Sequence, residues 1–128
     1  MAPKKLSIGS EYTLTEVQML IGGDSVSYLP QTAGRIVGAR FMKAGMNPNA
    51  PYQVLVGDRP VVKRKAELLA AQGGAIPVFM KEGTNRWLFH GPMRFVSYRT
   101  DRAAIVAALP GSTRDHQVVG VLAFADAA

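Results

Sequence analysis

The sequence predicts one α+β domain: a small, partly open and mainly antiparallel β-barrel flanked by two or three helices. The chain has 128 residues, the length of a single domain. In its second half, strand-like segments follow one another with only short turns between them, which favours antiparallel pairing. The regular strand–helix alternation of a doubly wound parallel sheet stops after Ile76. We therefore expect residues 1–128 to form one domain, with a flexible tail over 1–9.

The first predicted helix spans 13–21. Thr13 and Glu16 have the spacing of a capping box, and apolar residues recur behind them at helical intervals. Gly22 follows the last turn, where a glycine commonly ends a helix. A short helix of the same kind is expected at 101–109.

The clearest predicted helix spans 57–73. Asp58 is the expected cap, and Pro60 suits the first turn because its missing N–H has no partner there in any case. An apolar stripe runs along one side of this helix, made of Val62, Ala66 and Leu69. The stripe predicts that this side packs against the sheet.

The remaining periodic segments read as strands, because they are rich in β-branched and aromatic residues and end at turn residues. They are 35–41, with Gly38 as a bulge, and 52–56, 76–81, 86–89, 92–98 and 116–124. The polar loop 24–32 and the turn-rich loop 42–51 precede and follow the first of them.

The positive charge of the chain is concentrated in one stretch. The whole chain carries +6, and residues 31–65 hold seven basic residues against Asp58 alone. A concentrated positive field attracts polyanions, of which nucleic acid is the commonest. The alternative is that these side chains, the run Lys63–Lys65 above all, only solvate the surface.

The sequence lacks the signatures of catalysis. It has no cysteine, its nine acids are scattered, and neither His90 nor His116 has a partner at the spacing of a known motif. We therefore expect a protein that is not an enzyme and uses neither a metal nor a cofactor. Because no apolar run is long enough to cross a membrane and no signal peptide is visible, we expect a cytoplasmic protein without membrane contact.

Aromatic, amide and basic side chains gather in the segments around the basic stretch. Aromatic faces stack on bases and amides read base edges, so four residues are predicted to contact a base: Tyr28, Gln31, Asn47 and Trp87. Basic residues bind the backbone, so five are predicted to contact phosphates: Arg35, Arg40, Lys43, Lys63 and Arg64. The alternative for Trp87 and its neighbour Phe89 is packing in the core.

Over residues 20–100 the sequence resembles the SRA/YDG-type branch of the PUA-like superfamily. The matching elements are GRIV at 34–37, VF at 78–79 and WLFHG at 87–91. Such domains bind DNA, often with a modified base flipped into an aromatic pocket, and they accompany nucleases in restriction systems or read methylated cytosine.

The resemblance implies that the loop supplies Tyr28 and Gln31 and that the hairpin supplies Trp87. No carboxylate aligns with the base edge, and Asp24 is the only acid near the pocket loop. With no nuclease motif present, cleavage would belong to a partner nuclease or another effector.

Three further functions remain open from the sequence, one of which is a small enzyme that acts on a nucleotide. The same fold binds RNA in other PUA-like domains. The chain could also dock on an acidic partner protein, with all of its aromatic residues in the core.

Overall fold

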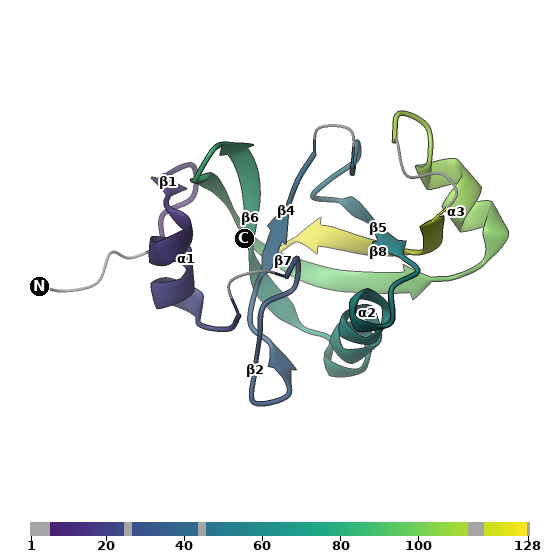
Figure 1. Cartoon of the computed structure of the whole chain (residues 1–128), viewed down its shortest axis with the longest axis horizontal. Helices are drawn as coiled ribbons and strands as arrows, with labels where there is room; N and C mark the ends of the chain where they lie inside the picture. The colour runs from purple at the N-terminus through teal and green to yellow at the C-terminus, as the bar shows by residue number, and fades with distance from the viewer. Residues whose placement is uncertain (1–5, 25–26, 44–45, 113–116, 128) are drawn as a thin grey trace, which may run out of the picture.

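The computed structural model describes residues 6–24, 27–43, 46–112 and 117–127. These residues form an α+β fold around one six-stranded sheet, as the sequence predicts (Figure 1). The strands of this sheet are β1 (Glu11–Tyr12), β4 (Ala39–Phe41), β5 (Gln53–Gly57), β6 (Ala75–Gly83), β7 (Arg86–Arg99) and β8 (Val118–Asp126).

The sheet is mainly antiparallel. The strand order is β4-β6-β7-β8-β5, and the short strand β1 pairs with part of β7. Among the described pairings only β4–β6 is parallel. Within the described part of the chain the path is open, with β4 and β5 at its ends. The confirmed feature is therefore antiparallel pairing, and the curled barrel stays a prediction.

The capping box of the first helix is confirmed in α1 (Leu14–Ile21). The Thr13 side chain accepts a hydrogen bond from the Glu16 N–H at 3.2 Å, and the Glu16 carboxylate accepts one from the Thr13 N–H at 2.9 Å. The turn between β6 and β7 adds a third bond, because Asn85 Oδ1 accepts from the Leu14 N–H at 2.7 Å. This bond joins the helix to the hairpin.

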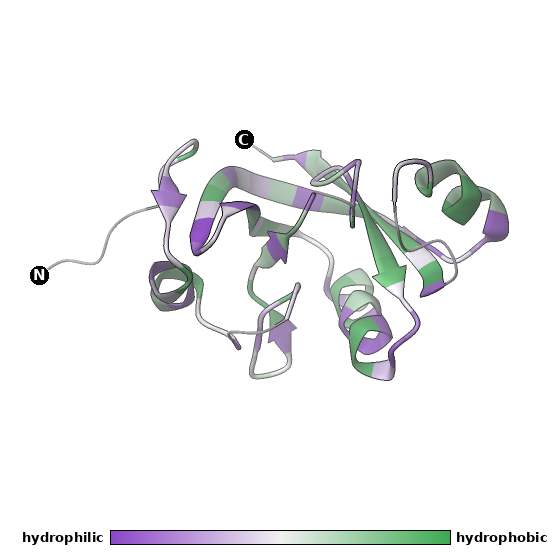
Figure 2. Cartoon of the chain, turned by 45° about the horizontal axis from the view of Figure 1, so that its top comes forward, coloured by the Kyte–Doolittle hydropathy of each residue, from purple (hydrophilic) through white to green (hydrophobic). Residues whose placement is uncertain are grey.

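The helix α2 (Pro60–Gln72) packs its predicted stripe against the sheet. Ala66 and Leu69 are buried and Val62 is half-buried, whereas the helix also presents hydrophilic residues around its circumference (Figure 2). The expected cap is wrong: Arg59, not Asp58, is the N-cap residue, and its side chain makes no capping bond. The third helix, α3 (Arg102–Ala108), is capped by Asp101 Oδ2, which accepts from the Ala104 N–H at 3.1 Å.

The predicted strand 35–41 is divided in two. β2 (Gln31–Thr32) and β3 (Arg35–Ile36) form a separate hairpin, and the chain reaches the main sheet only at β4. The turn at Ala33 and Gly34 has positive φ at both residues, which lets the end of the expected loop pair with the start of the predicted strand. Gln72 of α2 holds this hairpin through two 2.8 Å hydrogen bonds, one to the N–H and one to the carbonyl of Ile36.

Two predicted strands, 86–89 and 92–98, are one continuous strand in the structure. β7 passes through Gly91, whose φ of 128° accompanies a register shift against β6 between Val78 and Phe79. The register shift accommodates the irregular backbone at Gly91, which lies where the sequence predicts a break between two strands. β7 therefore stays paired with β6 on both sides of the shift.

Part of the expected N-terminal tail is packed on the sheet. The Gly9 N–H donates to the Phe89 carbonyl at 2.9 Å, the Ser7 N–H donates to the Tyr12 hydroxyl at 2.8 Å, and Leu6 packs against the Tyr12 cluster. Residues 6–9 are therefore not a free tail, and residues 1–5 lie outside the described part.

The main core lies between the sheet and α2 and contains Leu29, Ile36, Phe41, Leu69, Met93 and Leu122. A smaller cluster of Tyr12, Val17, Phe79 and Phe89 lies beneath α1. Gly38 sits between α1 and β6, where an added Cβ would lie 2.5 Å from Ile21 Cδ1 and 3.2 Å from the Pro77 carbonyl oxygen. A side chain there would have to displace the end of the Ile21 side chain.

We expect Gly38→Ala to lower the free energy of unfolding by about 1–3 kcal/mol, because overpacking displaces Ile21. The measurement is urea denaturation of purified protein. The control is Gly83→Ala, whose Cβ would meet no atom closer than 3.6 Å and is expected to change stability by less than about 1 kcal/mol. Equal stability of the two variants would show that Ile21 moves aside without cost.

Candidate nucleic-acid interface

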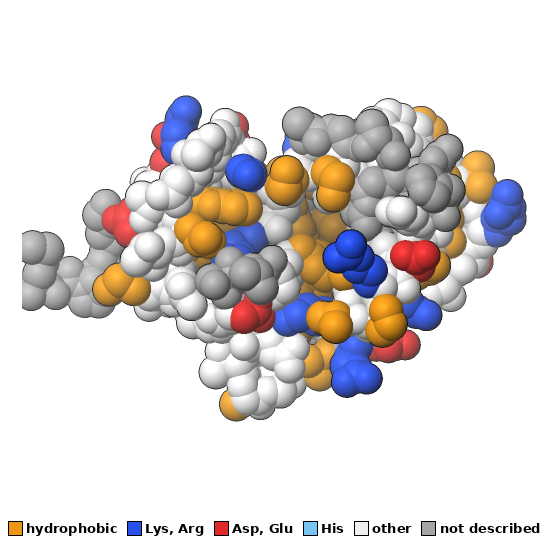
Figure 3. All heavy atoms as spheres, in the orientation of Figure 1, with side chains coloured by type: hydrophobic (Ala, Val, Ile, Leu, Met, Phe, Trp, Pro, Cys, Tyr) orange, Lys and Arg blue, Asp and Glu red, His pale blue; other side chains and the backbone are white. Residues whose placement is uncertain are grey.

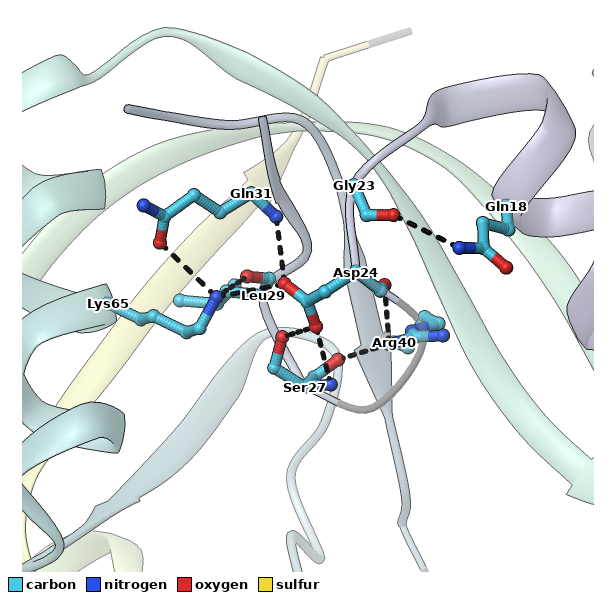
Figure 4. Close-up of polar contacts among 8 residues, drawn as sticks. All are labelled: Gln18, Gly23, Asp24, Ser27, Leu29, Gln31, Arg40 and Lys65. Atoms are coloured by element: carbon cyan, nitrogen blue, oxygen red, sulfur yellow. Dashed lines mark hydrogen bonds and ion pairs between the residues drawn. The ribbon is translucent and has the colours of Figure 1, made fainter. Parts of the chain in front are cut away.

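A buried lysine of α2 fixes the loop that follows α1. Lys65 is 8% exposed, and its Nζ donates to Asp24 Oδ2 at 3.1 Å, to the Leu29 carbonyl at 3.0 Å and to Gln31 Oε1 at 3.3 Å (Figure 4). All three ammonium donors are thus used within the protein. The alternative that Lys65 only solvates the helix surface is wrong, because the residue is buried and its ammonium group contacts these three acceptors.

Asp24 is the acidic centre of this cluster. Its carboxylate also accepts from the N–H and hydroxyl of Ser27 and from the Gln31 N–H. Burial raises the pKa of the Asp24 carboxyl, but the hydrogen bonds from Ser27 and Lys65 outweigh burial and hold its pKa well below the ordinary 3.8. Asp24 is therefore charged across the physiological range. Asp24 stabilises the loop after α1 through these hydrogen bonds, and it is not among the residues that line the pocket described below.

Arg40 ties the same loop to β4. Its Nη2 donates to the carbonyls of Ser27 at 2.7 Å and of Asp24 at 3.2 Å, and its backbone N–H donates to the Tyr28 carbonyl at 2.9 Å. The residue is 6% exposed, and burial lowers its pKa against the opposing effect of Asp24. The loop carbonyls draw the Arg40 guanidinium inward, so Arg40 belongs to a pocket wall and not to the exposed surface, and its predicted phosphate contact stays a prediction.

A pocket of about 370 Å³ is lined by the loop after α1, by β4, β5 and α2, and by the β6–β7 hairpin. Its lining residues are Leu14, Ser27, Tyr28, Arg40, Phe41, Met42, Met46, Asn47, Val54, Leu55, Val62, Lys81 and Trp87. Figure 3 shows the face of the molecule hollowed at its centre, with hydrophobic side chains deep in the hollow and basic side chains at its margin. The pocket therefore combines an apolar floor with positive charge.

Both predicted base-binding aromatics, Tyr28 and Trp87, line this pocket. The Tyr28 hydroxyl donates to the Val62 carbonyl at 2.7 Å, which fixes the ring beside α2. Trp87 is half-buried, packs against the Tyr12 cluster and also lines the pocket. Phe89 is buried in that cluster, as the core alternative predicts, so the two residues have different roles.

Asn47 lines the pocket, but its amide already has partners. Oδ1 accepts from the Leu55 N–H at 2.9 Å, and Nδ2 donates to the Met42 carbonyl at 3.1 Å. With the residue 7% exposed, the amide stabilises the loop between β4 and β5. The prediction that Asn47 reads a base edge is therefore corrected to a structural role.

The other predicted residues surround the pocket without lining it. Gln31 is exposed, and its side-chain oxygen accepts from Lys65. Arg35 lies on β3, Lys43 follows β4, and both are exposed. Lys63 and Arg64 are exposed on α2 directly after Val62, a lining residue. All four cations are exposed, and Lys43 and Lys63 directly follow the lining residues Met42 and Val62.

Several lining residues were not predicted, and Lys81 is the most consequential of them. It is exposed at the end of a buried run of β6 and pairs with Trp87. Strand alternation puts its side chain on the face opposite to that of the buried Met80, which was a usable signal. Met42 and Met46 carried no such signal, because the loop that places them has no period.

The histidine that the structure describes lies apart from the pocket. His90 Nε2 is 2.9 Å from Asp126 Oδ1, and the Tyr52 hydroxyl donates to Asp126 Oδ2 at 3.0 Å. These two hydrogen bonds, His90 first, lower the pKa of Asp126. His116 lies outside the described residues. Within the described ranges, no three His, Asp or Glu side chains are grouped so that they could hold a metal ion.

The fold and the pocket define an α+β domain with a ligand-sized cavity of aromatic and basic character. Comparison with solved structures finds similarity to the type IV phosphorothioation-dependent restriction endonuclease ScoMcrA, with a TM-score of 0.54 and 16% sequence identity. The match covers 94% of this chain and 27% of the endonuclease chain, so this chain spans about a quarter of that protein. At this identity, the likeness is one of fold.

No family model matches the sequence, and the curated proteins contain no significant match. None of the helices in the described segments is long and apolar enough to cross a membrane.

We expect Lys65→Met to lower the free energy of unfolding by ~2–4 kcal/mol, because it leaves the Asp24 carboxylate and two further acceptors without their donor. Methionine keeps the length and apolar stem of the side chain. The matched control is Lys63→Met on the exposed side of the same helix, for which the expected change is under about 0.5 kcal/mol. Urea denaturation measures both. A loss as small in Lys65→Met as in the control would contradict a central role for the buried ammonium.

Proposed function

We propose that this domain recognises DNA and receives a flipped or modified nucleotide in the pocket lined by Tyr28, Trp87 and Arg40. The observation that carries the proposal is the pocket itself, which brings aromatic faces and positive charge together from segments far apart in the sequence. Its volume of about 370 Å³ lies within the range of small-ligand sites, roughly 300–1,000 Å³.

Base flipping supplies a physical reason for each part of the pocket. A base taken out of the duplex loses its stacking partners, and aromatic or apolar walls replace them. Tyr28 and Trp87 would provide such walls here. The unstacking energy is least for a mismatched or damaged base, so for a paired modified base any preference would have to come from contacts inside the pocket.

The structural neighbour supports a role in restriction or defence. It is a restriction endonuclease that depends on phosphorothioation. Because this chain spans about a quarter of that protein, we propose that it contributes recognition and that a partner nuclease or other effector carries out cleavage. In this proposal the domain is not itself an enzyme.

Exposed cations next to the pocket would hold the DNA backbone. They are Arg35, Lys43, Lys63 and Arg64, and the last two lie beside the pocket wall on α2. Phosphate contacts of this kind position the duplex without reading its sequence. A competition between duplex DNA, single strands and structured RNA tests the choice of nucleic acid, and preference for RNA would replace DNA in the proposal.

We expect binding to duplex DNA to weaken with salt, and the double variant Lys63→Glu, Arg64→Glu to weaken it for every sequence alike. Loss of two phosphate contacts should reduce the slope of log affinity against log salt by about 1.8. The measurement is fluorescence anisotropy of labelled duplexes over a series of salt concentrations.

The charge-matched control is the double variant Arg94→Glu, Arg102→Glu. Both residues are exposed, and neither adjoins a residue of the pocket lining. An equal loss of affinity in the two double variants would show a general charge effect and remove α2 from the interface.

We expect a duplex with one modified cytosine to quench the fluorescence of Trp87, the single tryptophan of the chain, because a base would stack against it. Trp87→Leu should then cost about 1–3 kcal/mol of binding free energy. Leucine keeps apolar contact with the Tyr12 cluster, so the variant should remain folded. A screen over unmodified, methylated and hydroxymethylated cytosine at fixed salt ranks the modifications.

The control for the aromatic pocket is Tyr52→Leu. Tyr52 is 45% exposed and does not line the pocket, so affinity should be unchanged. Binding that survives Trp87→Leu without loss would mean that bases are not read in this pocket.

A further inference from the structure

Two methionines lie in the wall of the pocket. Met42 directly follows β4, Met46 lies in the loop between β4 and β5, and both line the pocket. Met42 is 41% exposed, and Met46 is half-buried. A thioether side chain is apolar and flexible, so it packs well against surfaces of irregular outline. The two side chains therefore belong to the apolar surface that a base in the pocket would contact.

The other methionines that the structure describes differ from this pair in exposure or in place. Met80 and Met93 are buried in the main core, where an oxidant dissolved in water reaches them slowly. Met19 on α1 is 73% exposed and is not among the residues that line the pocket. Among the described methionines, access to solvent and a place in the pocket therefore coincide only in Met42 and Met46.

We propose that Met42, and more slowly Met46, are oxidation sites that control the binding of a nucleotide in the pocket. The oxidant is a peroxide. The methionine sulfur attacks the terminal oxygen of hydrogen peroxide, so an S–O bond forms while the O–O bond breaks. The sulfur loses two electrons, and the hydroxide that leaves takes the remaining proton and becomes water. This inference rests on the proposed function and deepens it, because it names a chemical control of the same site.

A sulfoxide would change the pocket wall without removing its aromatic residues. The new oxygen is a strong hydrogen-bond acceptor, and an entering base would have to displace the water bound to it. The Tyr28 hydroxyl is held by the Val62 carbonyl. Trp87 packs against the Tyr12 cluster, and neither of these contacts involves a methionine. We therefore expect the oxidised protein to stay folded and to bind a nucleotide more weakly.

The test treats the intact chain with dilute hydrogen peroxide and compares each sample with its own untreated reference. Mass spectrometry of peptides measures the oxidation rate of every methionine, and fluorescence anisotropy measures the affinity for a labelled duplex with one 5-methylcytosine. We expect Met42 to oxidise faster than Met80 and Met93. The affinity should fall about tenfold or more, the order expected when a polar group is buried without a partner. An unfolding transition that remains cooperative after treatment shows that the protein is still folded.

The double variant Met42→Leu, Met46→Leu isolates the pocket. Leucine keeps an apolar side chain of similar size and cannot form a sulfoxide, so this variant should keep its own untreated affinity after the treatment. The matched control is Met19→Leu, which removes an exposed methionine outside the pocket lining and should lose affinity as the unsubstituted chain does. Reduction by the two stereospecific methionine sulfoxide reductases should restore the affinity of the oxidised chain.

Three results would overturn the inference: an affinity that survives oxidation of Met42 and Met46, a loss that the double variant shares, or a loss that the reductases do not reverse. Oxidation of Met80 and Met93 ahead of Met42 would do the same, because the pocket would then not be the accessible site. The proposed function fails separately. A duplex that quenches Trp87 equally before and after oxidation leaves the function standing and removes the oxidation sites as a control. Absence of duplex binding removes both.

Discussion

The pocket depends on one buried ammonium group. Lys65 reaches from α2 beneath the loop after α1 and donates to Asp24, Leu29 and Gln31 at 3.0–3.3 Å. An ammonium group is stable in such surroundings only when its donors are used, so the loop can take few other conformations without stranding a charge. The interaction therefore selects one loop geometry, which is of more use to a binding site than added stability.

The remaining walls of the pocket follow from that geometry. Once Asp24 is held, the carbonyls of Asp24 and Ser27 point at Arg40, which fixes the loop to β4. Tyr28 is then carried against α2, where its hydroxyl meets the Val62 carbonyl. Helix, loop and sheet edge are thus connected through polar groups, while the apolar core beneath them supplies most of the burial. Loss of the ammonium would disturb the site before it disturbed the core.

The elements were more predictable from the sequence than the roles of its polar residues. The capping box of α1 and the apolar stripe of α2 depend on residues close in sequence, and both are confirmed. Four lining residues, Tyr28, Arg40, Asn47 and Trp87, were selected because of their chemistry. The burial of Lys65, by contrast, depends on acceptors 34–41 positions away. No local pattern encodes those distances, so the run Lys63–Lys65 was interpreted only as phosphate-binding or as solvating the helix surface.

Trp87 shows how the same fold supports both core and site. It lies on the hairpin strand whose turn caps α1 through Asn85, and it packs on the cluster that contains Phe89. Its ring is therefore positioned by the small core while it also borders the pocket. If Trp87 stacks on a base as proposed, a ring held in this way would lose little conformational freedom on binding, so more of the interaction energy would be available. The contacts of Lys65 with Asp24, Leu29 and Gln31 would act in the same sense on Tyr28, which lies between Asp24 and Leu29 in the sequence.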